Sequence, residues 1–358
     1  MRSGLPIDAA LEPLATALAK HRNAVLVAPP GAGKSTVVPL ALLEQPWAAG
    51  KKVVMLEPRR LAARAVATRM ASTLRESAGE TVGYRMRLET RVSASTRLEV
   101  VTEGVFTRML HDDPALTDIA AVLFDEYHER SLHADAGLAL ALDAQRHVAP
   151  ELRLLAMSAT LDGARVAALL GAAPVVESEG RMFAVDVRYL GTGLPVLPGP
   201  GTEPIDAAVA RAVVRALREA EGDALVFLPG AGEIRRAQAR LAEAALDTNV
   251  DVLPLFGELT PGEQDAAIAP ARPGRRKVVL ATNIAETSLT IDGVKIVVDA
   301  GLERRNAFDP ATGMSSLATQ RISRASAEQR AGRAGRTAPG VCYRLWRDRK
   351  STPSELQS

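Results

Sequence analysis

The chain has 358 residues, and its 47% of hydrophobic residues is enough to fill the cores of about two or three ordinary domains. Its formal net charge of +2 at pH 7 favours no class of partner, so a nucleic-acid or membrane partner has to be argued from local motifs. The apolar runs are shorter than the ~18 residues of a membrane-spanning helix, and the N-terminus lacks a signal-peptide pattern. The single cysteine, Cys342, excludes an internal disulfide. We therefore expect a cytoplasmic protein without membrane contact, in which Cys342 is buried near a strand.

The first expected strand, residues 25–28, runs into a glycine-containing turn and then a helix, in the sequence VLVAPPGAGKSTVVPLAL. Glycines at 31 and 33 allow successive N–H groups to converge, and the positive end of the helix adds to this anion site. Lys34 supplies a charge for the outer phosphates, and the Ser35 hydroxyl is placed to ligate Mg²⁺. The strict motif has glycine where this chain has Ala28. The segment predicts a loop that binds ATP with Mg²⁺.

Further apolar strands alternate with helical segments through both halves of the chain. Uninterrupted apolar strands are typical of parallel sheets covered on both faces. The Gly- and Pro-rich residues 190–204 predict a linker, and the apolar face of a helix from Ile205 opens the second half. The fold class is therefore α/β, with a first domain at 14–178, a linker at 179–202, a second domain at 203–347 and a polar tail at 348–358. The expected strands lie near 53–57, 98–102, 121–125, 153–158, 224–228, 252–255, 277–281 and 296–300.

The segment AVLFDEYHER places two carboxylates at the end of an apolar strand, where ligands of open α/β sheets bind. Asp125 is expected to hold Mg²⁺ through water, and Glu126 to act as general base on the attacking water. The next expected strand ends in MSAT. Ser158 and Thr160 of this segment could couple the acidic pair to the other domain.

Three arginines near the end of the chain recur at intervals of three in SAEQRAGRAGRT. On a helix, this spacing would place Arg330, Arg333 and Arg336 on one face. The intervening Gly332 and Gly335 cost a helix about 1 kcal/mol each, which a solvated basic face would not explain. Guanidinium groups match phosphate oxygens and stabilise charge during phosphoryl transfer. If they act on a nucleotide held by the first domain, hydrolysis requires the domains to close.

Eight segments, taken in order, closely resemble the DExH/DEAH-box branch of superfamily 2 helicases over roughly residues 14–347. The resemblance implies two RecA-like P-loop domains with mainly parallel sheets, hydrolysis of ATP with Mg²⁺ in the cleft between them, and 3′-to-5′ movement along nucleic acid. It also implies single-stranded or partly duplex nucleic acid as partner, RNA favoured, and a monomeric core. The segments are APPGAGKST, EPRRLAARA, TEGVFTRML, DEYH, SAT, FLPG, ATNIAETSLTIDG and QRAGRAGR.

The resemblance also assigns roles to individual positions, and residues 299–323 resemble the stretch that forms a strand-separating β-hairpin in this family. The catalytic group would be Lys34, Asp125, Glu126, His128, Gln329, Arg333 and Arg336. Nucleotide binding would involve Pro30, Gly31, Ala32, Gly33, Lys34, Ser35, Thr36, Arg69, Ser158, Thr160, Thr287 and Asp292, with Ser35, Asp125 and Glu126 serving the metal. Nucleic acid would meet Arg59, Arg60, Thr102, Glu103, Gly104, Thr282 and Asn283.

Three departures from the family pattern change these expectations. Tyr127 stands where the name-giving motif has alanine. Arg69 could stack on the nucleotide base, but the second-domain position expected to be aromatic offers only Ile268, so other NTPs are expected to serve as well as ATP. The sequence stops at Ser358, whereas family members continue into further C-terminal domains, so we expect weaker unwinding.

Other classes of function fit fewer of these features. A small-molecule kinase would use the phosphate loop but not a second domain with spaced arginines. A DNA motor differs from an RNA motor only through 2′-hydroxyl contacts, and a nucleotide-gated binding module would need closure without hydrolysis. A metal site at His128 and His133 has neither the H-E-x-x-H spacing nor a cysteine ligand. The 3% aromatic content favours backbone contacts over base stacking.

Overall fold

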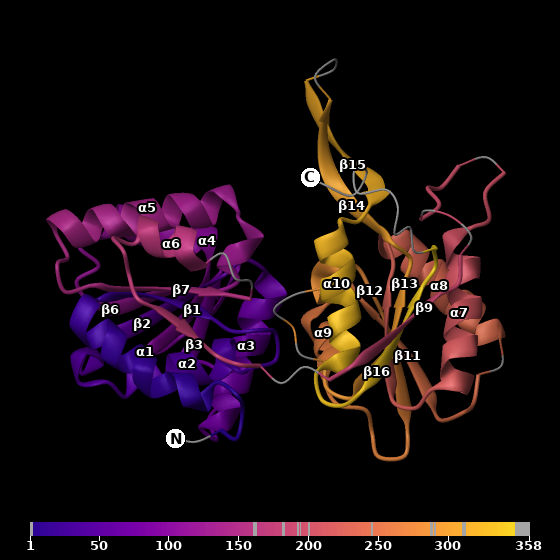
Figure 1. The fold of residues 1–358 in the computed structure, drawn as a ribbon, viewed down its shortest axis with the longest axis horizontal. Coiled ribbons are helices and arrows are strands. Elements are labelled where there is room, and N and C mark those ends of the chain that lie inside the picture. Colours follow the sequence, from indigo (N-terminus) through magenta and orange to yellow (C-terminus); the bar gives the residue numbers. More distant parts are fainter. Residues whose placement is uncertain are drawn as a thin grey trace. The chain divides into compact units, whose positions relative to one another are not determined.

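The computed structural model describes residues 3–159, 163–180, 183–191, 193, 195–199, 201–244, 246–286, 289, 291–309 and 313–347. The chain divides into two compact units, Met1–Arg181 and Met182–Ser358. Each unit is built on a mainly parallel sheet covered by helices, which confirms the predicted α/β class (Figure 1). None of the described helices is long and apolar enough to cross a membrane.

The first unit contains an eight-stranded sheet in the order β4-β3-β5-β2-β6-β7-β1-β8, and β3 and β4 alone pair antiparallel among its described strands. Its strands are β1 Asn23–Val27, β2 Lys52–Glu57, β3 Val82–Met86, β4 Glu89–Arg91, β5 Leu98–Thr102, β6 Ile119–Phe124, β7 Arg153–Ser158 and β8 Val175–Glu177. Its helices are α1 Asp8–His21, α2 Lys34–Leu43, α3 Arg60–Thr73, α4 Glu103–Asp112, α5 Leu132–His147 and α6 Gly163–Leu169, with short 3₁₀ turns η1 Pro46–Ala48 and η2 Tyr127–Glu129.

Both faces of this sheet are buried, which explains why its central strands are apolar without interruption. Helices α1, α2 and α3 cover one face, where Leu26 and Met55 pack against Leu14 and Met70. Helices α4, α5 and α6 cover the other face (Figure 1), where residues such as Val25 and Val54 pack against Phe106 and Leu138. Because the described strands other than β4 are parallel, their carboxyl ends lie at one edge of the sheet. The candidate site residues come directly after these ends.

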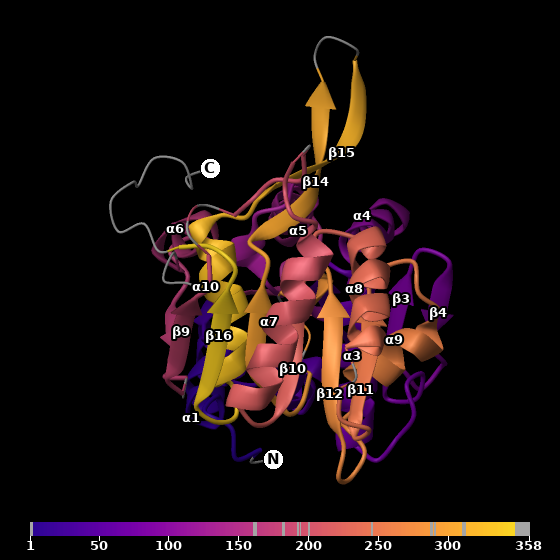
Figure 2. The ribbon, with the colours of Figure 1, turned by 90° about the vertical axis from the view of Figure 1, so that its right-hand side faces the viewer.

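The second unit contains a six-stranded parallel sheet in the order β11-β12-β10-β13-β16-β9. Its strands are β9 Val185–Tyr189, β10 Asp223–Phe227, β11 Val250–Leu255, β12 Arg276–Ala281, β13 Val294–Asp299 and β16 Gly340–Arg344. Its helices are α7 Ile205–Glu219, α8 Ala231–Glu243, α9 Pro261–Ile268 and α10 Arg324–Gly332, with 3₁₀ turns η3 Asn283–Ala285 and η4 Arg333–Gly335. Strands β14 Leu302–Asp309 and β15 Met314–Arg321 form an antiparallel hairpin that projects from this unit (Figure 2).

Strand β9 corrects the linker that we predicted at 179–202, because it pairs with β16 and belongs to the second sheet. It lies at the edge of that sheet and alternates half-buried with exposed residues, in the sequence VDVRY. A search for continuous apolar runs misses such a strand, as it also misses β3, β4, β8 and β16. The hairpin that the family resemblance implied for residues 299–323 is present as β14 and β15.

Cys342 lies on β16, between β13 and β9, and has no exposed surface. Burial raises the pKa of its thiol far above the ordinary value, and the nearby Asp299 charge adds to this. We expect the native protein to be inert to a thiol reagent such as DTNB at pH 8, because attack requires an accessible thiolate. The same protein unfolded in guanidinium should release one equivalent of product. Rapid reaction of the native protein would contradict the burial of Cys342.

Candidate nucleotide site and nucleic-acid interface

The loop between β1 and α2 has the backbone that phosphate binding requires. Gly31 and Gly33 adopt φ values of +83° and +101°, and Gly33 caps α2. A Cβ at Gly33 would also lie 2.8 Å from Leu5 Cδ1 and 3.1 Å from Ile7 Cγ2, so glycine is needed there both for conformation and for space. The loop leads directly to the N-terminus of α2, whose first N–H groups form an anion site.

Ala28, the departure from the strict loop motif, fits this loop without strain. It is completely buried, and its N–H donates to the carbonyl of Ser158 over 2.9 Å. Ala28 is not among the residues with positive φ. A side chain at this position therefore does not disturb the turn, and the difference from the motif does not weaken the interpretation of the loop.

Lys34, the first residue of α2, forms a buried ion pair with Glu126, which follows β6. Its Nζ lies 2.8 Å from Glu126 Oε1, and the two side chains are 5% and 6% exposed. Burial alone would lower the pKa of Lys34, but the carboxylates of Glu126 and Asp125 outweigh it and raise the pKa. The lysine is therefore cationic, and Glu126 is the anionic group that it binds.

Glu126 is held in an unusual backbone conformation. Its φ and ψ are +49° and +34°, the left-handed region, which costs a non-glycine residue roughly 1–2 kcal/mol. Its N–H donates to Asp125 Oδ1 over 2.8 Å. Strained residues of this kind cluster at functional sites, where the surrounding structure enforces them. Here the sharp turn directs the carboxylate that follows β6 toward Lys34.

His128 connects the acidic pair to the segment after β7. Its Nδ1 accepts a hydrogen bond from the Ala159 N–H over 3.2 Å, so the proton of the neutral ring resides on Nε2, which lies 3.4 Å from Glu126 Oε2. The Ala159 backbone of MSAT thus contacts the acidic pair through the His128 ring. Ser158 is buried at the end of β7 and its carbonyl binds Ala28, while Thr160 lies outside the described residues.

Glu57, which the sequence analysis did not single out, is a third carboxyl group in this site. It ends β2 next to β6, and its side chain is completely buried. Neither of its carboxyl oxygens, nor Asp125 Oδ2, has a hydrogen-bond partner in the described part of the chain. Burial, followed by the charges of Asp125 and Glu126, raises the pKa of Glu57 well above its ordinary value. The available signal was an acidic residue ending a buried strand, the same signal that identified Asp125.

The candidate nucleic-acid residues of the first unit lie on neighbouring strand ends. Strands β2 and β5 are adjacent, with Glu57 opposite Thr102. Arg59 forms an ion pair of 3.2 Å with Glu129, and Arg60 is exposed at the start of α3. Thr102 precedes α4, whose first residue Glu103 accepts a hydrogen bond from Ser131, and a Cβ at Gly104 would meet nothing within 4 Å. The two segments therefore follow neighbouring strand ends, where α3 and α4 begin. Arg69 is exposed further along α3.

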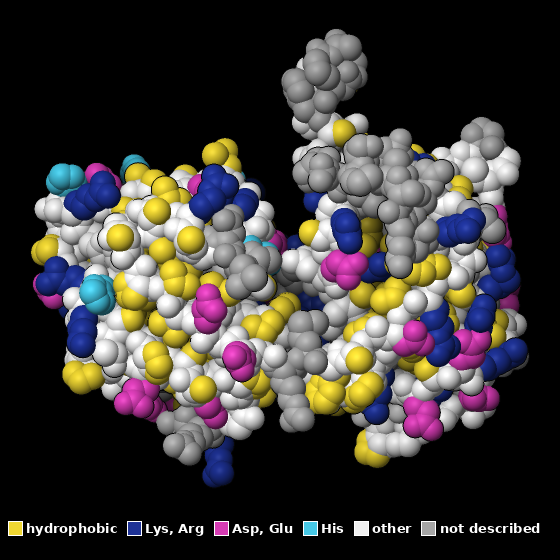
Figure 3. Space-filling view, in the orientation of Figure 1, with side chains coloured by type: hydrophobic (Ala, Val, Ile, Leu, Met, Phe, Trp, Pro, Cys, Tyr) yellow, Lys and Arg dark blue, Asp and Glu magenta, His cyan; other side chains and the backbone are white. Residues whose placement is uncertain are grey.

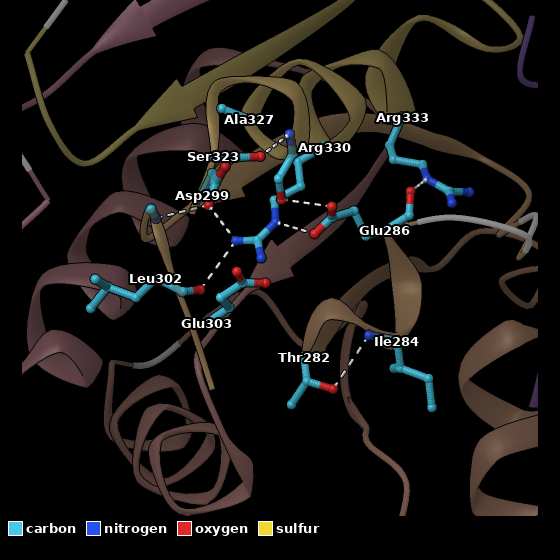
Figure 4. A network of polar contacts seen from close by, with 12 residues as sticks. Thr282, Ile284, Glu286, Asp299, Leu302, Glu303, Ser323, Ala327, Arg330 and Arg333 are labelled. Atoms are coloured by element: carbon cyan, nitrogen blue, oxygen red, sulfur yellow. Dashed lines mark hydrogen bonds and ion pairs between the residues drawn. The ribbon is translucent and has the colours of Figure 1, made fainter. Parts of the chain in front are cut away.

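In the second unit, the segment after β12 lies against the arginine segment (Figure 4). Arg333 Nε donates to the Glu286 carbonyl over 2.8 Å, and Arg333 also donates to the Leu289 carbonyl. Arg336 donates to the same Leu289 carbonyl over 3.2 Å. Thr282 caps η3 ahead of Asn283. Gln329 and Asp292 are half-buried, on α10 and before β13, and Thr287 lies outside the described residues.

The prediction that three arginines share one helical face is wrong. Helix α10 ends at Gly332, and Arg333 begins the tighter turn η4. Arg330 is 1% exposed and forms ion pairs with Glu286 and Asp299 inside the unit. The two glycines weaken the helix after Arg330, and the two carboxylates bind the Arg330 guanidinium inside the unit.

A strand running into a phosphate loop, with a loop lysine opposite acidic residues at the end of another strand of the same sheet, defines a P-loop NTPase domain, here accompanied by a second RecA-like unit. Residues 9–169 match the DEAD/DEAH box helicase family, and residues 208–338 match the helicase conserved C-terminal domain. The chain belongs to the DEAD/DEAH-box helicase family.

Individual relatives agree with this family. The chain is 52% identical over 356 residues to the ATP-dependent RNA helicase HrpB of Escherichia coli strain K12, covering 99% of this chain and 43% of that protein. Crystal structures of the Escherichia coli DEAH/RHA helicase HrpB and DExH-box NTPase HrpB match with TM-scores of 0.87 and 0.81 at 51% identity, covering 99% and 100% of this chain. The chain spans 45% and 43% of those two structures, less than half of each relative.

Proposed function

We propose that this chain is the ATP-hydrolysing core of an RNA helicase that moves along single-stranded RNA in the 3′-to-5′ direction. The observation that carries the proposal is the buried group of Lys34, Glu126 and His128 at the phosphate loop, which supplies a phosphate-binding cation and an oriented general base. The similarity to a protein named as an ATP-dependent RNA helicase supports RNA as the polymer. Arg333 and Arg336 would contact the nucleotide when the second unit closes on the first.

Mg²⁺ fits the charge of this site. The carboxyl groups of Asp125 and Glu126 are buried with a single lysine, and Asp125 Oδ2 is a buried oxygen without a hydrogen bond in the described residues. Among those residues no cluster of three His, Cys, Asp or Glu side chains could hold a metal by itself. That suits Mg²⁺, which takes most of its ligands from phosphates and water. Asp125 and Ser35 would hold the ion, which neutralises charge on the phosphates.

The residues of the site would act by exchanging partners. When ATP binds, Lys34 leaves Glu126 for the outer phosphate oxygens, and the Glu126 carboxylate becomes free to accept a proton from the attacking water. The Ala159 N–H would hold the His128 ring in place, and the ring's Nε2–H would in turn orient the Glu126 carboxylate. The Lys34–Glu126 ion pair would thus keep the base engaged until a phosphate competes for the lysine.

We propose that the nucleic acid contacts two sets of residues. They are Arg59, Arg60 and Thr102–Gly104 of the first unit, and Thr282 and Asn283 of the second. Basic side chains on the face drawn in Figure 3 are interspersed with acidic ones on both units, consistent with the small net charge. Binding would therefore depend on a few local phosphate contacts. A DNA strand offers the same phosphates, so DNA is the second candidate substrate. We further propose a monomeric core. A cytoplasmic location is proposed because the only cysteine is buried and unbridged.

Contacts of this kind predict a defined salt dependence. The logarithm of the affinity for single-stranded RNA should fall linearly with the logarithm of salt concentration, by about 0.7 per phosphate contact. Arg60→Ala should weaken binding and reduce that slope by about 0.7, whereas Arg218→Ala, at an exposed position on α7, should leave the slope unchanged. Fluorescence anisotropy of labelled RNA measures both. A salt-independent affinity would refute a phosphate-based grip.

Steady-state ATP hydrolysis with no polymer, with single-stranded RNA and with single-stranded DNA tests the function itself. Lys34→Ala, which removes the loop cation, is the blank. We expect RNA to stimulate turnover more than DNA. Stronger stimulation by DNA would favour the DNA alternative, equal stimulation would contradict a preference for RNA, and stimulation by neither polymer would overturn the proposal for this chain.

A further inference from the structure

Arg330 is the largest side chain of the described part of the chain with almost no exposed surface, at 1%. Its guanidinium donates to three acceptors, Glu286 Oε2 at 2.9 Å, Asp299 Oδ1 at 3.0 Å and the Leu302 carbonyl at 3.2 Å (Figure 4). Its Cζ also lies 4.8 Å from the ring centroid of Phe227. The group is therefore held from several directions at once.

One side of this network lies at the root of the β14–β15 hairpin. Asp299 ends β13, and Leu302 begins β14. Asp299 Oδ1 also accepts the Gly301 N–H over 2.8 Å, and Gly301 adopts a φ of +73° in the turn between the two strands. A single guanidinium thus binds both the side chain and the carbonyl that flank this turn, and so fixes the direction in which the hairpin leaves the sheet.

The other side of the network reaches the segment proposed to contact nucleotide. The Glu286 carboxylate accepts from Arg330 Nε and from the Ser326 hydroxyl, at 2.9 and 2.6 Å, while the Glu286 carbonyl accepts from Arg333 Nε at 2.8 Å. Glu286 is therefore bound by both arginines: Arg330 binds the Glu286 side chain, and Arg333 binds the Glu286 backbone carbonyl. A displacement of Arg333 would be transmitted through Glu286 to Arg330.

Burying a guanidinium with two carboxylates carries a large desolvation cost, and a well-packed apolar group of similar volume often gives equal stability. A planar fork of five donors can serve three acceptors in different directions, which a lysine ammonium on a flexible stem cannot. The arrangement therefore provides a geometric connection between segments more than it provides stability.

We propose that Arg330 is a positioning residue that connects the Arg333–Arg336 segment to the root of the hairpin, so that nucleotide bound to the protein alters the hairpin through Glu286 and Arg330. The inference deepens the proposed function, because it names the path from the nucleotide to the element that would separate strands. The role proposed for Arg330 differs from the one that its spacing in the sequence predicted, in which Arg330 acts together with Arg333 and Arg336.

Hydrogen exchange of peptides covering the hairpin root, with and without ADP and beryllium fluoride, tests this connection without RNA. In the parent chain we expect nucleotide to change exchange at the root by at least about threefold. Arg330→Lys should abolish that change while the nucleotide dissociation constant stays within about threefold. Arg344→Lys is the matched control, since Arg344 is 5% exposed and donates to the Ala327 carbonyl of α10 at 2.9 Å, and it should keep the change.

If Arg330→Lys does not fold, Glu286→Gln, which retains the shape of the side chain, makes the same test. A nucleotide-dependent change that survives in both variants overturns the inference, as does its absence in the parent chain with nucleotide bound. The readout needs no polymer, so failure of RNA to stimulate hydrolysis would sink the proposed function without deciding this experiment.

Discussion

Replacement of Glu126 by glutamine is expected to lower ATP turnover by at least about 100-fold, the loss typical of removing a general base. Nucleotide affinity should be maintained or increased. The reason lies in the buried ion pair of 2.8 Å, in which the Glu126 carboxylate competes with phosphate for Lys34. Glutamine removes the competing charge, leaves the size of the side chain nearly unchanged, and cannot accept the proton of the attacking water.

Single-turnover hydrolysis and the dissociation constant of a fluorescent ATP analogue separate these two effects. Glu151→Gln is the control, because Glu151 pairs with Arg22 at the surface. This variant should hydrolyse ATP like the parent chain. Turnover that is unchanged in Glu126→Gln would show that another group accepts the proton. Weaker nucleotide binding would contradict the exchange of partners proposed for Lys34.

The sequence predicted those elements that are determined by residues close together in the chain. Strands β1, β2, β6 and β7 are apolar without interruption because both sheet faces are buried, and that pattern is visible in one dimension. The phosphate loop and the acidic strand end are local motifs in the same sense. Strand β9 was missed because an edge strand has one exposed face, so its alternating residues resemble a polar connection.

Contacts between distant segments could not be predicted in the same way. The His128 ring is oriented by the backbone N–H of Ala159, a group that every residue possesses and that no motif marks. Glu57 becomes notable only because β2 lies beside β6, which brings a third carboxyl group next to Asp125. Arg330 shares its spacing with Arg333 and Arg336, yet the end of α10 and the carboxylates of Glu286 and Asp299 turn it inward.

The positions of the remaining two arginines indicate which is the better probe of nucleotide contact. Arg333 is 4% exposed and binds two backbone carbonyls, at Glu286 and Leu289, so its removal would also disturb the fold of the second unit. Arg336 is half-buried and donates to the Leu289 carbonyl. Because Arg333 binds the carbonyls of Glu286 and Leu289, truncating Arg336 should leave these two residues in place.

Arg336→Ala is therefore expected to reduce ATP turnover by about 10²- to 10³-fold with nucleotide affinity changed by less than about threefold. An arginine that stabilises charge developing in phosphoryl transfer contributes to the transition state far more than to ground-state binding. Turnover at saturating ATP and the nucleotide dissociation constant measure the two terms, and the melting temperature of the variant checks that its fold is intact.

Arg336→Lys keeps the charge but not the planar fork, so it should recover only part of the lost rate. An equal loss of turnover and affinity would mean that Arg336 binds ground-state nucleotide. Unchanged turnover would mean that the Arg336 side chain is not needed for hydrolysis, which would leave Arg333 as the proposed nucleotide contact of this segment. In that case the hairpin could sense the nucleotide only through Arg333 and Glu286, so this variant decides which of the two arginines connects hydrolysis to the second unit.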